Sequence, residues 1–271
     1  MPELPEVEST RRGIASSLQG HRITTLRIYD RRLRWPIDEG VPEAVAGQRV
    51  LEVGRRAKYL LLGLERGILI LHLGMSGSLR VLPEDTPRIK HDLFDLQLEP
   101  GLSLRFNDPR RFGSLHYTTE DASQHRLLRG LAPEPLEAEF SAEYLWRITR
   151  TRRAAIKQVL MNGRLVTGVG NIYASEALFR ARIRPRRGSR RLTRADCARL
   201  VGAVRTTLDG AIRAGGATLR NYVGTEGNPG AFRQRLNVYE RDGQPCRVCR
   251  TPILRITQGQ RSTYFCPHCQ Q

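Results

Sequence analysis

The chain contains almost no lysine, comparatively few acidic residues and no long apolar run. Only Lys58, Lys90 and Lys157 are lysines among its 45 basic residues, so the other 42 are arginines. Acidic residues number 27, which leaves a formal net charge of +18. So large an excess of positive charge indicates a polyanionic partner, and nucleic acid is the simplest one. A basic membrane-surface protein is the alternative, but no long basic amphipathic helix is evident in the sequence.

Two further absences concern the location of the protein. No apolar run reaches the ~20 residues of a membrane-crossing helix. The acidic first residues also differ from the basic start of a signal peptide. We therefore expect no membrane association and a cytoplasmic location. Because lysine is so rare, each lysine is a candidate for a role that an arginine guanidinium does not fill, such as giving up a proton. The alternative is that each lysine is present by chance.

The first eight residues offer a chemistry that no interior segment has. If Met1 is removed, Pro2 becomes a free secondary amine, and an α-amino group titrates near ~8, against ~10.4 for lysine, so more of it is neutral and nucleophilic. Such an amine can condense with an aldehyde carbon to give an iminium. Nearby carboxylates are potential general acids or bases: Glu3, Glu6 and Glu8. The simpler alternative is that Pro5 and its acidic neighbours start a well-capped helix that runs to about Leu18.

The 271 residues have room for two domains with a small appendage, and the first half is rich in predicted strands. Turn signals at residues 65–67 and 99–101 separate neighbouring strands as hairpins. Many short antiparallel strands favour a sandwich or a flattened barrel. The predicted strands are residues 23–28, 50–53, 59–64, 68–73, 78–82, 93–98 and 102–106, with similar runs to about residue 117.

Three segments in this half interrupt the strand pattern. Residues 55–59 open a strand with three cations, which suits a phosphate or simply a solvated edge. A glycine-flanked loop carries Met75, although such a methionine is more often part of a core. Residues 107–113 form a turn in which Phe112 follows two arginines, as an element that wedges into a DNA duplex requires. His91, beside a lysine, is placed to hydrogen-bond a phosphate.

The second half has helical periodicity from about residue 131. Ser141 is predicted to cap a helix to about Arg150, and residues 152–162 form another. Residues 193–196 resemble a capping box that starts a helix to about Arg213.

Two glycine-rich segments lie in the same half of the chain. Gly168 and Gly170 precede Asn171, which we expect to cap a helix whose free amides bind a phosphate, unless the segment is a plain turn between packed helices. Residues 215–230 form a long glycine-rich segment that either closes over a ligand or is a linker.

Four cysteines near the end of the sequence have the spacing of a metal site. Two residues separate Cys246 from Cys249 and Cys266 from Cys269, with sixteen residues between the pairs. Four thiolates on two tight turns suit a zinc ribbon. Two alternatives to a metal site are less suitable. Disulfides are disfavoured in the expected cytosol, and a redox-active pair of cysteines would not need the second pair of cysteines. We predict one structural Zn²⁺, which holds the intervening hairpin with Arg261 and takes no part in the chemistry.

Taken together, these segments resemble bacterial formamidopyrimidine-DNA glycosylases, in order and across essentially the whole chain. The segments that carry the resemblance are residues 2–8, 108–113, 168–174 and the zinc ribbon. The resemblance implies an α+β fold with three domains. Residues 1–130 would form an N-terminal helix with a β-sandwich, residues 131–230 a helix-two-turn-helix domain with a lesion loop, and residues 231–271 the zinc ribbon. It also implies a nucleoid-associated monomer that holds damaged double-stranded DNA between its two halves.

The same resemblance implies a reaction and residues that carry it out. The reaction is excision of oxidised purines, chiefly 8-oxoguanine and formamidopyrimidines, followed by strand cleavage. Pro2 would attack the sugar C1′, and Glu3 would donate the proton that assists ring opening. Lys58 would serve β-elimination and Arg261 δ-elimination, and both also hold phosphates, while Glu6 is a supporting acid.

The resemblance further assigns DNA contacts. One group of side chains would fill the space that the flipped nucleotide leaves: Met75, Arg110 and Phe112. Lys157 and residues 218–230 lie where the family handles the everted base. The other contacts with DNA would be His91, Arg110, Arg152, Asn171 and Tyr239.

Two alternatives to this function remain. The first is a sister enzyme similar to endonuclease VIII, which prefers oxidised pyrimidines, but Leu4, where that branch tends to carry glycine, and the turn at residues 108–113 argue against it. The second is a non-catalytic DNA-binding protein that uses its arginines and zinc ribbon only for affinity. Such a protein would bind DNA in a salt-dependent manner without preferring damaged sites.

Overall fold

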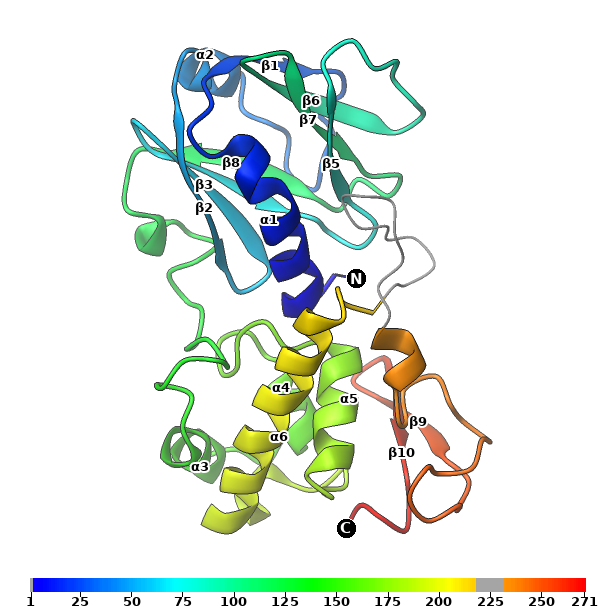
Figure 1. Cartoon of the computed structure of the whole chain (residues 1–271). Helices are drawn as coiled ribbons and strands as arrows, with labels where there is room; N and C mark the ends of the chain where they lie inside the picture. Colours follow the sequence, from blue (N-terminus) through cyan, green and yellow to red (C-terminus); the bar gives the residue numbers. More distant parts are fainter. Residues whose placement is uncertain (1, 218–231) are drawn as a thin grey trace. The chain divides into compact units, whose positions relative to one another are not determined.

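The computed structural model describes residues 2–217 and 232–271 of the chain (Figure 1). These residues form two compact units. The first holds the residues up to Arg129 together with residues 214–217, and the second holds Gly130–Arg213 and Phe232–Gln271. Within the described part of the chain, no helix combines the length and the apolar character that crossing a membrane requires. The three domains with boundaries near residues 130 and 231 remain a prediction.

The first unit begins with helix α1, Leu4–Leu18, which ends where the sequence predicts. Pro5 lies in its first turn, where the missing N–H of proline costs no hydrogen bond. In the same turn the carboxylate of Glu6 accepts the backbone N–H of Glu3 at 2.8 Å, which closes the start of the helix. The apolar face of α1 is buried in the core of this unit through Val7, Ile14 and Leu18.

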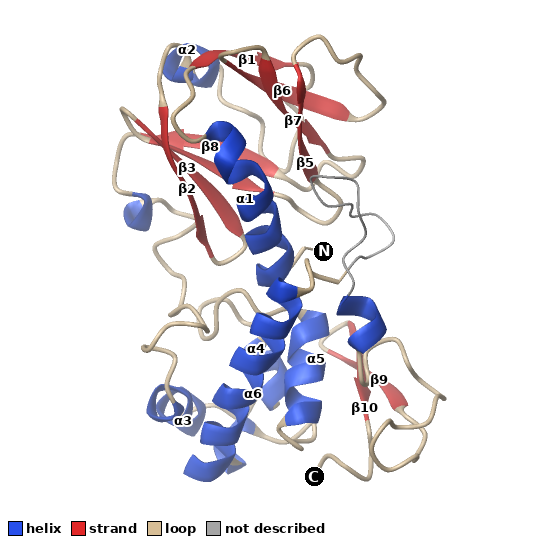
Figure 2. Ribbon diagram, viewed as in Figure 1, coloured by secondary structure: helices blue, strands red, loops and turns tan. Residues whose placement is uncertain are grey.

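Two antiparallel four-stranded sheets make up the rest of the first unit (Figure 2). One has the strand order β1-β6-β7-β5 and the other the order β2-β3-β4-β8. A short helix, α2 (Val41–Val45), and a 3₁₀ turn, η1 (Ala122–Gln124), lie in the connections. The strands are β1 (Ile23–Ile28), β2 (Val50–Arg56), β3 (Tyr59–Leu64), β4 (Ile68–His72), β5 (Ser78–Pro83), β6 (Asp92–Leu98), β7 (Leu102–Asn107) and β8 (Ser114–Thr118).

Both sheets contribute to a single apolar core. Leu62 and Leu71 from one sheet pack in the same cluster as Phe94 and Leu104 from the other. Strand β3 shows why the sheets pack this way, since its residues alternate between buried and half-buried positions and so give the sheet one apolar face. The predicted α+β class and the N-terminal β-sandwich are confirmed.

The predicted hairpins at residues 65–67 and 99–101 are confirmed, because β3 pairs with β4 and β6 pairs with β7. The prediction that residues 55–59 open a strand is wrong. Arg56 ends β2, Tyr59 begins β3, and the two residues between them form the turn of a hairpin. Ala57 has a φ of 55°, a left-handed conformation that is uncommon for alanine. The sequence therefore did not predict a turn at this residue.

The second unit contains four helices among its described residues: α3 (Ala142–Arg150), α4 (Ile156–Leu160), α5 (Asn171–Arg180) and α6 (Arg194–Arg213). Ser141 caps α3 as predicted, because its hydroxyl accepts the N–H of Tyr144 at 3.1 Å. The capping box before α6 is also confirmed. The N–H of Asp196 donates to the hydroxyl of Thr193 at 3.0 Å, and the Asp196 carboxylate accepts the N–H of Thr193 at 2.9 Å.

The helix predicted for residues 152–162 is shorter in the structure and comprises only α4. The preceding backbone pairs with another segment instead of continuing a helix. The N–H of Ser189 donates to the carbonyl of Ala154 at 2.9 Å, and the N–H of Ile156 donates to the carbonyl of Arg187 at 2.9 Å. These bonds are tertiary, so local helical periodicity could not reveal them.

The chain ends in a small hairpin of β9 (Leu254–Gln258) and β10 (Arg261–Phe265). Its two-residue turn has positive φ angles at both Gly259 and Gln260, 56° and 59°, as a type I′ turn requires. Two 3₁₀ turns complete the unit, η2 (Ser189–Arg191) and η3 (Phe232–Arg235). Most of the predicted loop at residues 215–230 lies outside the described residues.

Candidate active site

The start of α1 is enclosed within the first unit. Pro2 is buried, and Glu3 is 3% exposed. Glu6, 1% exposed, uses one carboxylate oxygen for the N–H of Glu3 and the other for the N–H of Ala217, each at 2.8 Å. Gly216, with a φ of +84°, makes this approach possible, because a β carbon there would lie 2.9 Å from the carboxylate. Glu6 therefore holds both the backbone beside Pro2 and a segment 211 residues away in the sequence.

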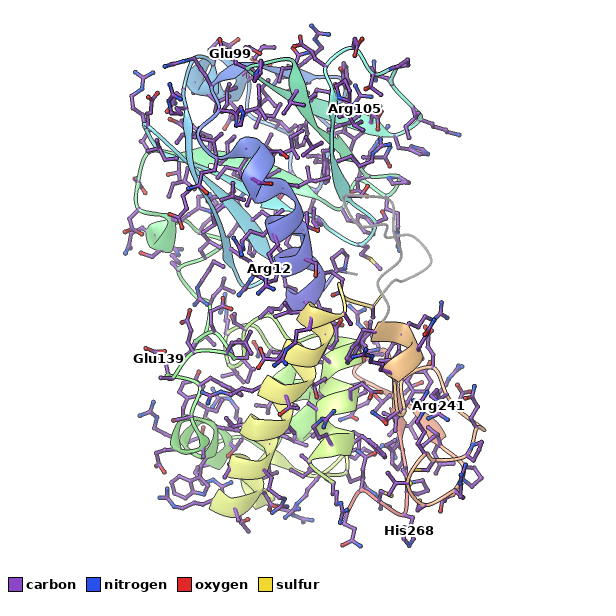
Figure 3. All side chains as sticks on the ribbon, viewed as in Figure 1. Arg12, Glu99, Arg105, Glu139, Arg241 and His268 are labelled. Atoms are coloured by element: carbon purple, nitrogen blue, oxygen red, sulfur yellow. The ribbon has the colours of Figure 1, made fainter. Side chains whose placement is uncertain are left out.

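The turn that carries Lys58 is tied to α1. The carboxylate of Glu8 accepts hydrogen bonds from Arg11 and Arg12, both at 2.8 Å, and from Arg55 of β2 at 3.2 Å. Of these residues, Arg12 is labelled on α1 in Figure 3. Burial raises the pKa of Glu8, but these guanidinium groups outweigh it and lower that pKa to about 2. Arg55 also donates to the carbonyl of Ala57 at 2.8 Å, in the turn itself. The structure thus brings Lys58 and the start of α1 into one connected region.

His72 belongs to the same region, and the sequence did not single it out. It pairs in register with Tyr59 across β3 and β4, with ring centroids 4.8 Å apart. Its Nδ1 accepts the N–H of Gly74 at 3.0 Å. Burial, and then the positive charges of Lys58 and Arg34, lower the pKa of His72 to about 4, so its ring is neutral at physiological pH. The sequence feature that could have identified His72 is its position, because it ends the strand that precedes the Met75 loop.

Asp108 organises the predicted wedge residues. Its carboxylate, which is fully buried, accepts the hydroxyl of Ser76 at 2.6 Å, beside Met75. It also accepts the backbone N–H groups of Arg110 and Gly113 at 3.2 Å and 2.8 Å. One carboxylate therefore joins the Met75 loop to the loop that contains Arg110 and Phe112.

The two loops also touch through their backbones. A β carbon on Gly74 would overlap the backbone of Phe112 and Gly113, so only glycine permits this approach. Phe112 is 43% exposed, and the guanidinium of Arg110 lies 4.8 Å from the centre of its ring. His91 is close to the same loop, because its carbonyl accepts the N–H of Asp108 at 3.1 Å. The structure thus groups four predicted DNA contacts at one end of the sandwich strands.

In the second unit, Lys157 and Asn171 are joined directly. Lys157 is 1% exposed, and its ammonium donates to the side-chain oxygen of Asn171 at 2.6 Å, to the hydroxyl of Thr263 at 2.7 Å and to the carbonyl of Ser262 at 3.3 Å. The Asn171 amide nitrogen donates to the same carbonyl at 3.0 Å. This network fixes the start of α5 against β10, whose first residue is Arg261.

The prediction that Asn171 caps α5 is wrong. The N-cap is Gly170, which lacks a side chain, and Asn171 is the first residue of the helix. Its side chain bonds to Lys157 and to β10 instead of to the helix backbone. Phosphate binding by this segment remains a prediction.

Glu176 is a second residue that the sequence did not single out. This carboxylate, 3% exposed on α5, accepts the backbone N–H groups of Asn237, Val238 and Tyr239 at 2.9, 2.9 and 3.0 Å. The ring of Tyr239 packs against Tyr264 of β10, with centroids 5.1 Å apart. Tyr239 is therefore placed by α5 and by the hairpin together. The sequence feature that could have identified Glu176 is that it is an acidic residue on an otherwise apolar helix face.

Arg152 lies apart from this network, just beyond α3. Its guanidinium donates to the carbonyl of Ile148 at 2.6 Å, which satisfies a free carbonyl of the last helical turn. Its backbone carbonyl accepts the hydroxyl of Ser189 at 3.0 Å. The position of Arg152 is thus fixed by the helix end.

The four cysteines converge as predicted. The sulfur atoms of Cys246, Cys249, Cys266 and Cys269 all lie within 4.8 Å of one another. Two of the sulfur separations are 3.9 Å and 3.4 Å. A tetrahedral zinc with bonds of about 2.3 Å requires sulfurs about 3.8 Å apart, so the four ligands fit this ion. All four positions are taken by protein, as in a structural centre, and the site holds one zinc that supports the hairpin.

Comparison with known families covers most of the chain. Residues 1–115 match the formamidopyrimidine-DNA glycosylase N-terminal domain, and residues 131–223 match the H2TH domain of the same glycosylases. Residues 243–271 match the zinc finger found in FPG and IleRS. The three matches follow one another in the order that the sequence motifs predict.

Individual relatives agree with these matches. The chain is 54% identical to the formamidopyrimidine-DNA glycosylase of Thioalkalivibrio sulfidiphilus and 53% identical to that of Janthinobacterium sp. (strain Marseille), with all of each chain covered. The crystal structure of MutM (Fpg) from Thermus thermophilus is 40% identical, with a TM-score of 0.89, 99% of this chain and 98% of that one being covered. A Lactococcus lactis FPG point mutant in complex with Fapy-dG-containing DNA is 31% identical over all of both chains, with a TM-score of 0.93. The chain belongs to the formamidopyrimidine-DNA glycosylase family.

Proposed function

We propose that this protein removes oxidised purines, chiefly 8-oxoguanine and formamidopyrimidines, from duplex DNA and then cleaves the strand at the resulting site. The observation that carries the proposal is the start of α1, where a proline that becomes the first residue after removal of Met1 is buried beside a buried glutamate. Family membership supports the substrate class. The Lactococcus lactis relatives were solved with DNA that contains Fapy-dG or an abasic site.

The first chemical step is displacement of the damaged base. The nitrogen of Pro2 attacks C1′ of the damaged nucleotide, the glycosidic bond breaks with its electron pair leaving on the base, and the proton that the proline nitrogen loses neutralises the departing base. Glu3 donates a proton to O4′ as the sugar ring opens, which leaves an iminium between Pro2 and C1′. Glu6 fixes the backbone of Glu3 at 2.8 Å, and Glu6 is therefore a positioning residue in this step.

The second step is strand cleavage. The iminium withdraws electrons, so loss of a proton from C2′ expels the 3′ phosphate, and a second elimination expels the 5′ phosphate. Lys58 lies on a turn tied to α1 through Arg55, which suits proton transfer or phosphate binding near the sugar. Arg261 is exposed at the start of β10, and because a guanidinium binds phosphate oxygens but does not readily give up a proton, its contribution to δ-elimination is to hold the departing phosphate.

Base removal requires that the damaged nucleotide leave the stack. Met75, Arg110 and Phe112 fill the space that it vacates, and Asp108 holds the two loops that carry them in one arrangement. His91, Arg152, Asn171 and Tyr239 contact the DNA backbone. Lys157 is bonded to protein acceptors on at least three sides, so it acts on DNA through Asn171. The protein works as a monomer on double-stranded DNA, and its zinc has a structural role.

A panel of lesion duplexes tests this function. The released base is measured by mass spectrometry with 8-oxoguanine, Fapy-dG, an oxidised pyrimidine and undamaged guanine in the same sequence. We expect fastest release of the two purine lesions and none of guanine. The pyrimidine belongs in the panel because the Lactococcus lactis enzyme was also solved with oxidised-pyrimidine DNA. Preferential release of the pyrimidine would overturn the purine assignment, and equal binding of all duplexes without release would leave only a DNA-binding protein.

A further inference from the structure

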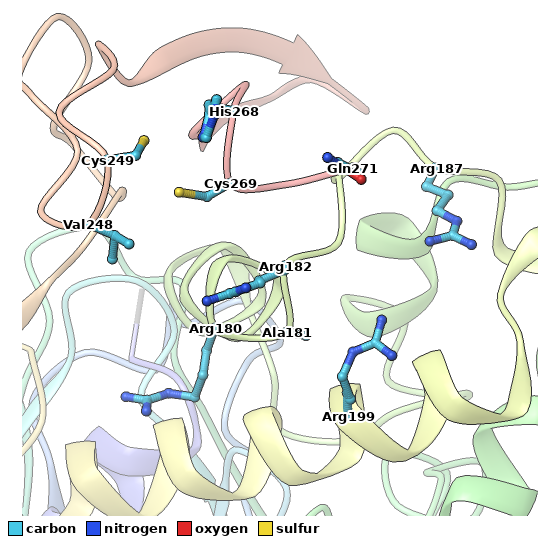
Figure 4. Close-up of a pocket in the computed structure, with 10 residues that line it drawn as sticks. All are labelled: Arg180, Ala181, Arg182, Arg187, Arg199, Val248, Cys249, His268, Cys269 and Gln271. Carbon is cyan, nitrogen blue, oxygen red and sulfur yellow. The ribbon is translucent and has the colours of Figure 1, made fainter.

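A pocket of about 730 Å³ lies at the carboxyl end of α5, within the second unit. Arg180, Arg182, Arg187 and Arg199 line the pocket. In Figure 4 Arg187 and Arg199 point toward one another, and Arg180 points to the opposite side of the helix end. Among the described residues that line it, none is Asp or Glu. Its volume lies within the range of small-molecule sites, roughly 300 to 1,000 Å³. The proposed DNA contact Asn171 is at the opposite end of α5, about 14 Å away for nine residues of helix.

The charge of these arginines is only partly neutralised. Arg187 and Arg199 share a single carboxylate, that of Asp196, and the Arg187 contact measures 2.9 Å. The side chains of Arg180 and Arg182 make no ion pair or hydrogen bond with any of the described residues, and both are exposed. Arg180 and Arg182 are therefore the two arginines of the pocket whose side chains have no acidic partner among the described residues.

The backbone at Arg182 gives a second indication. Arg182 donates its N–H to the carbonyl of Phe179, and Ile183 donates to the carbonyl of Leu178, both at 3.0 Å. This pair of bonds is a Schellman motif, whose left-handed position favours glycine. Arg182 occupies that position with a φ of +59°. A β carbon is unfavourable there, and strain of this kind is typical of residues that serve a site.

Two structural explanations bear on this charge. A cation at a helix carboxyl end stabilises the helix dipole, which explains one arginine at the end of α5. Zinc bound to four thiolates carries two negative charges, and Cys249 and Cys269 line the pocket. Among the described residues, however, none of the four arginines hydrogen-bonds to a cysteine sulfur, so neither explanation uses the hydrogen-bond donors of Arg180 and Arg182.

We propose that this pocket binds the phosphate chain of a nucleoside triphosphate. Guanidinium groups bind phosphate oxygens in pairs, and several of them around one concave site suit a compact polyphosphate rather than a duplex. Val248, 65% exposed at the same pocket, offers an apolar surface for the base. The ligand is thus bound at a site separate from the proposed contacts with damaged DNA.

The test uses the full-length, zinc-loaded protein and isothermal titration with ATP and with tripolyphosphate at ~0.15 M salt, where exposed charges are screened beyond about 8 Å. Wild type binds both, with ATP tighter because of the contact with Val248. The informative variant is Arg182→Gly, which places glycine at a left-handed position, so its melting temperature is equal to or above that of wild type. Its affinity for ATP falls about tenfold or more, because a charge-assisted contact is lost. Excision of 8-oxoguanine is unchanged.

Arg250→Gly is the matched control. Arg250 is also an exposed arginine with a left-handed backbone, φ 68°, but it does not line the pocket. This variant removes the same charge from the same unit and keeps wild-type affinity for ATP. If Arg182→Gly and Arg250→Gly weaken ATP binding equally, ATP affinity depends only on the net charge of the protein, and the proposal is wrong. Absence of ATP binding by wild type at millimolar concentration, or release of zinc by Arg182→Gly with ATP affinity unchanged, would overturn it as well.

Discussion

The ammonium of Lys157 donates a 2.6 Å hydrogen bond to the side-chain oxygen of Asn171 and so fixes the direction of that amide. Lys157→Met keeps the length of the side chain but removes the donor. We expect the free energy of unfolding to fall by about 1 to 3 kcal/mol, because buried acceptors lose their partner. We expect affinity for a duplex with an abasic-site analogue to fall about tenfold, because Asn171 is no longer oriented. Urea unfolding and fluorescence anisotropy measure the two effects.

The control for this prediction is Lys90→Met, which removes an exposed lysine. It should leave stability unchanged and reduce DNA affinity only through net charge. The mechanism is then checked by a double-mutant cycle with Asn171→Ala. Because the two side chains are in contact, we expect their effects on DNA affinity to be non-additive by at least ~0.5 kcal/mol. Simple additivity would show that Lys157 does not act through Asn171.

Asp108 is predicted to control the wedge without touching DNA. Asp108→Asn removes a negative acceptor that serves Ser76, Arg110 and Gly113. We expect a loss of stability of about 1 to 3 kcal/mol and a fall in the rate of base release, with less effect on salt-dependent binding to undamaged DNA. A matched variant is Asp121→Asn, in which an exposed aspartate accepts from Ser123 outside this loop. If both variants release 8-oxoguanine at the wild-type rate, Asp108 does not organise the wedge.

Two histidines predict a pH dependence of stability. The pKa of His72 and that of His116 are each lowered to about 4, mainly by burial, and Nε2 of His116 has no hydrogen-bond partner among the described residues. The unfolded chain takes up protons at both positions as the pH falls below the ordinary value of 6.5, and the folded chain does not. The free energy of unfolding should therefore decrease from about pH 6.5 toward about pH 4, by at most about 1.4 kcal/mol per pH unit for each histidine.

The window between about pH 6.5 and about pH 5 isolates this effect. Glu8 and Asp30 have a pKa of about 2 in the folded protein, so their contribution is lost only below their ordinary values of 4.5 and 3.8. Burial also lowers the pKa of His125, whose ring lies 5.6 Å from that of His116. His116→Phe should therefore reduce the slope in this window without abolishing it, as measured by chemical unfolding at each pH. A wild-type stability that is flat across the window would contradict the neutral state of both rings.

Removal of zinc should unfold the hairpin of β9 and β10. The four cysteines belong to the apolar cluster that packs this hairpin, so loss of the ion places unbound thiolates within it, and structural zinc supplies folding free energy directly. With a chelator, we expect loss of DNA binding together with increased proteolysis after residue 243. Added Zn²⁺, but not Mg²⁺, should restore both, because thiolates prefer the softer ion. DNA binding that survives complete metal removal would show that the hairpin does not depend on zinc.

Local sequence patterns were sufficient for elements that local chemistry determines. Pro5 with Glu6 marked the start of α1, and Thr193 with Asp196 marked the start of α6, since both are capping arrangements within one turn. The zinc centre followed from cysteine spacing alone, because two tight turns bring their ligands together. Family resemblance gave the order of the remaining segments.

Features that depend on distant contacts were missed. The helix predicted for residues 152–162 is shortened by pairing with residues 187–189, and the side chain of Asn171 bonds to β10 instead of capping α5. The sequence analysis did not single out Glu176. Its carboxylate binds the backbone of residues 237–239, some sixty positions away in the sequence. A left-handed alanine at position 57 gave no local signal. For the shortened helix, for Asn171 and for Glu176, the deciding interaction is tertiary.

The role of Pro2 as the nucleophile is tested most directly by reductive trapping. Protein without Met1, verified by intact mass, is mixed with an 8-oxoguanine duplex and sodium borohydride, next to the same protein with two extra residues before Pro2. The account predicts a covalent DNA adduct that maps to Pro2 in the processed protein and no adduct in the extended one, because an internal proline nitrogen is an amide. Processed protein that binds the duplex without forming an adduct, or equal adducts from both proteins, would contradict it.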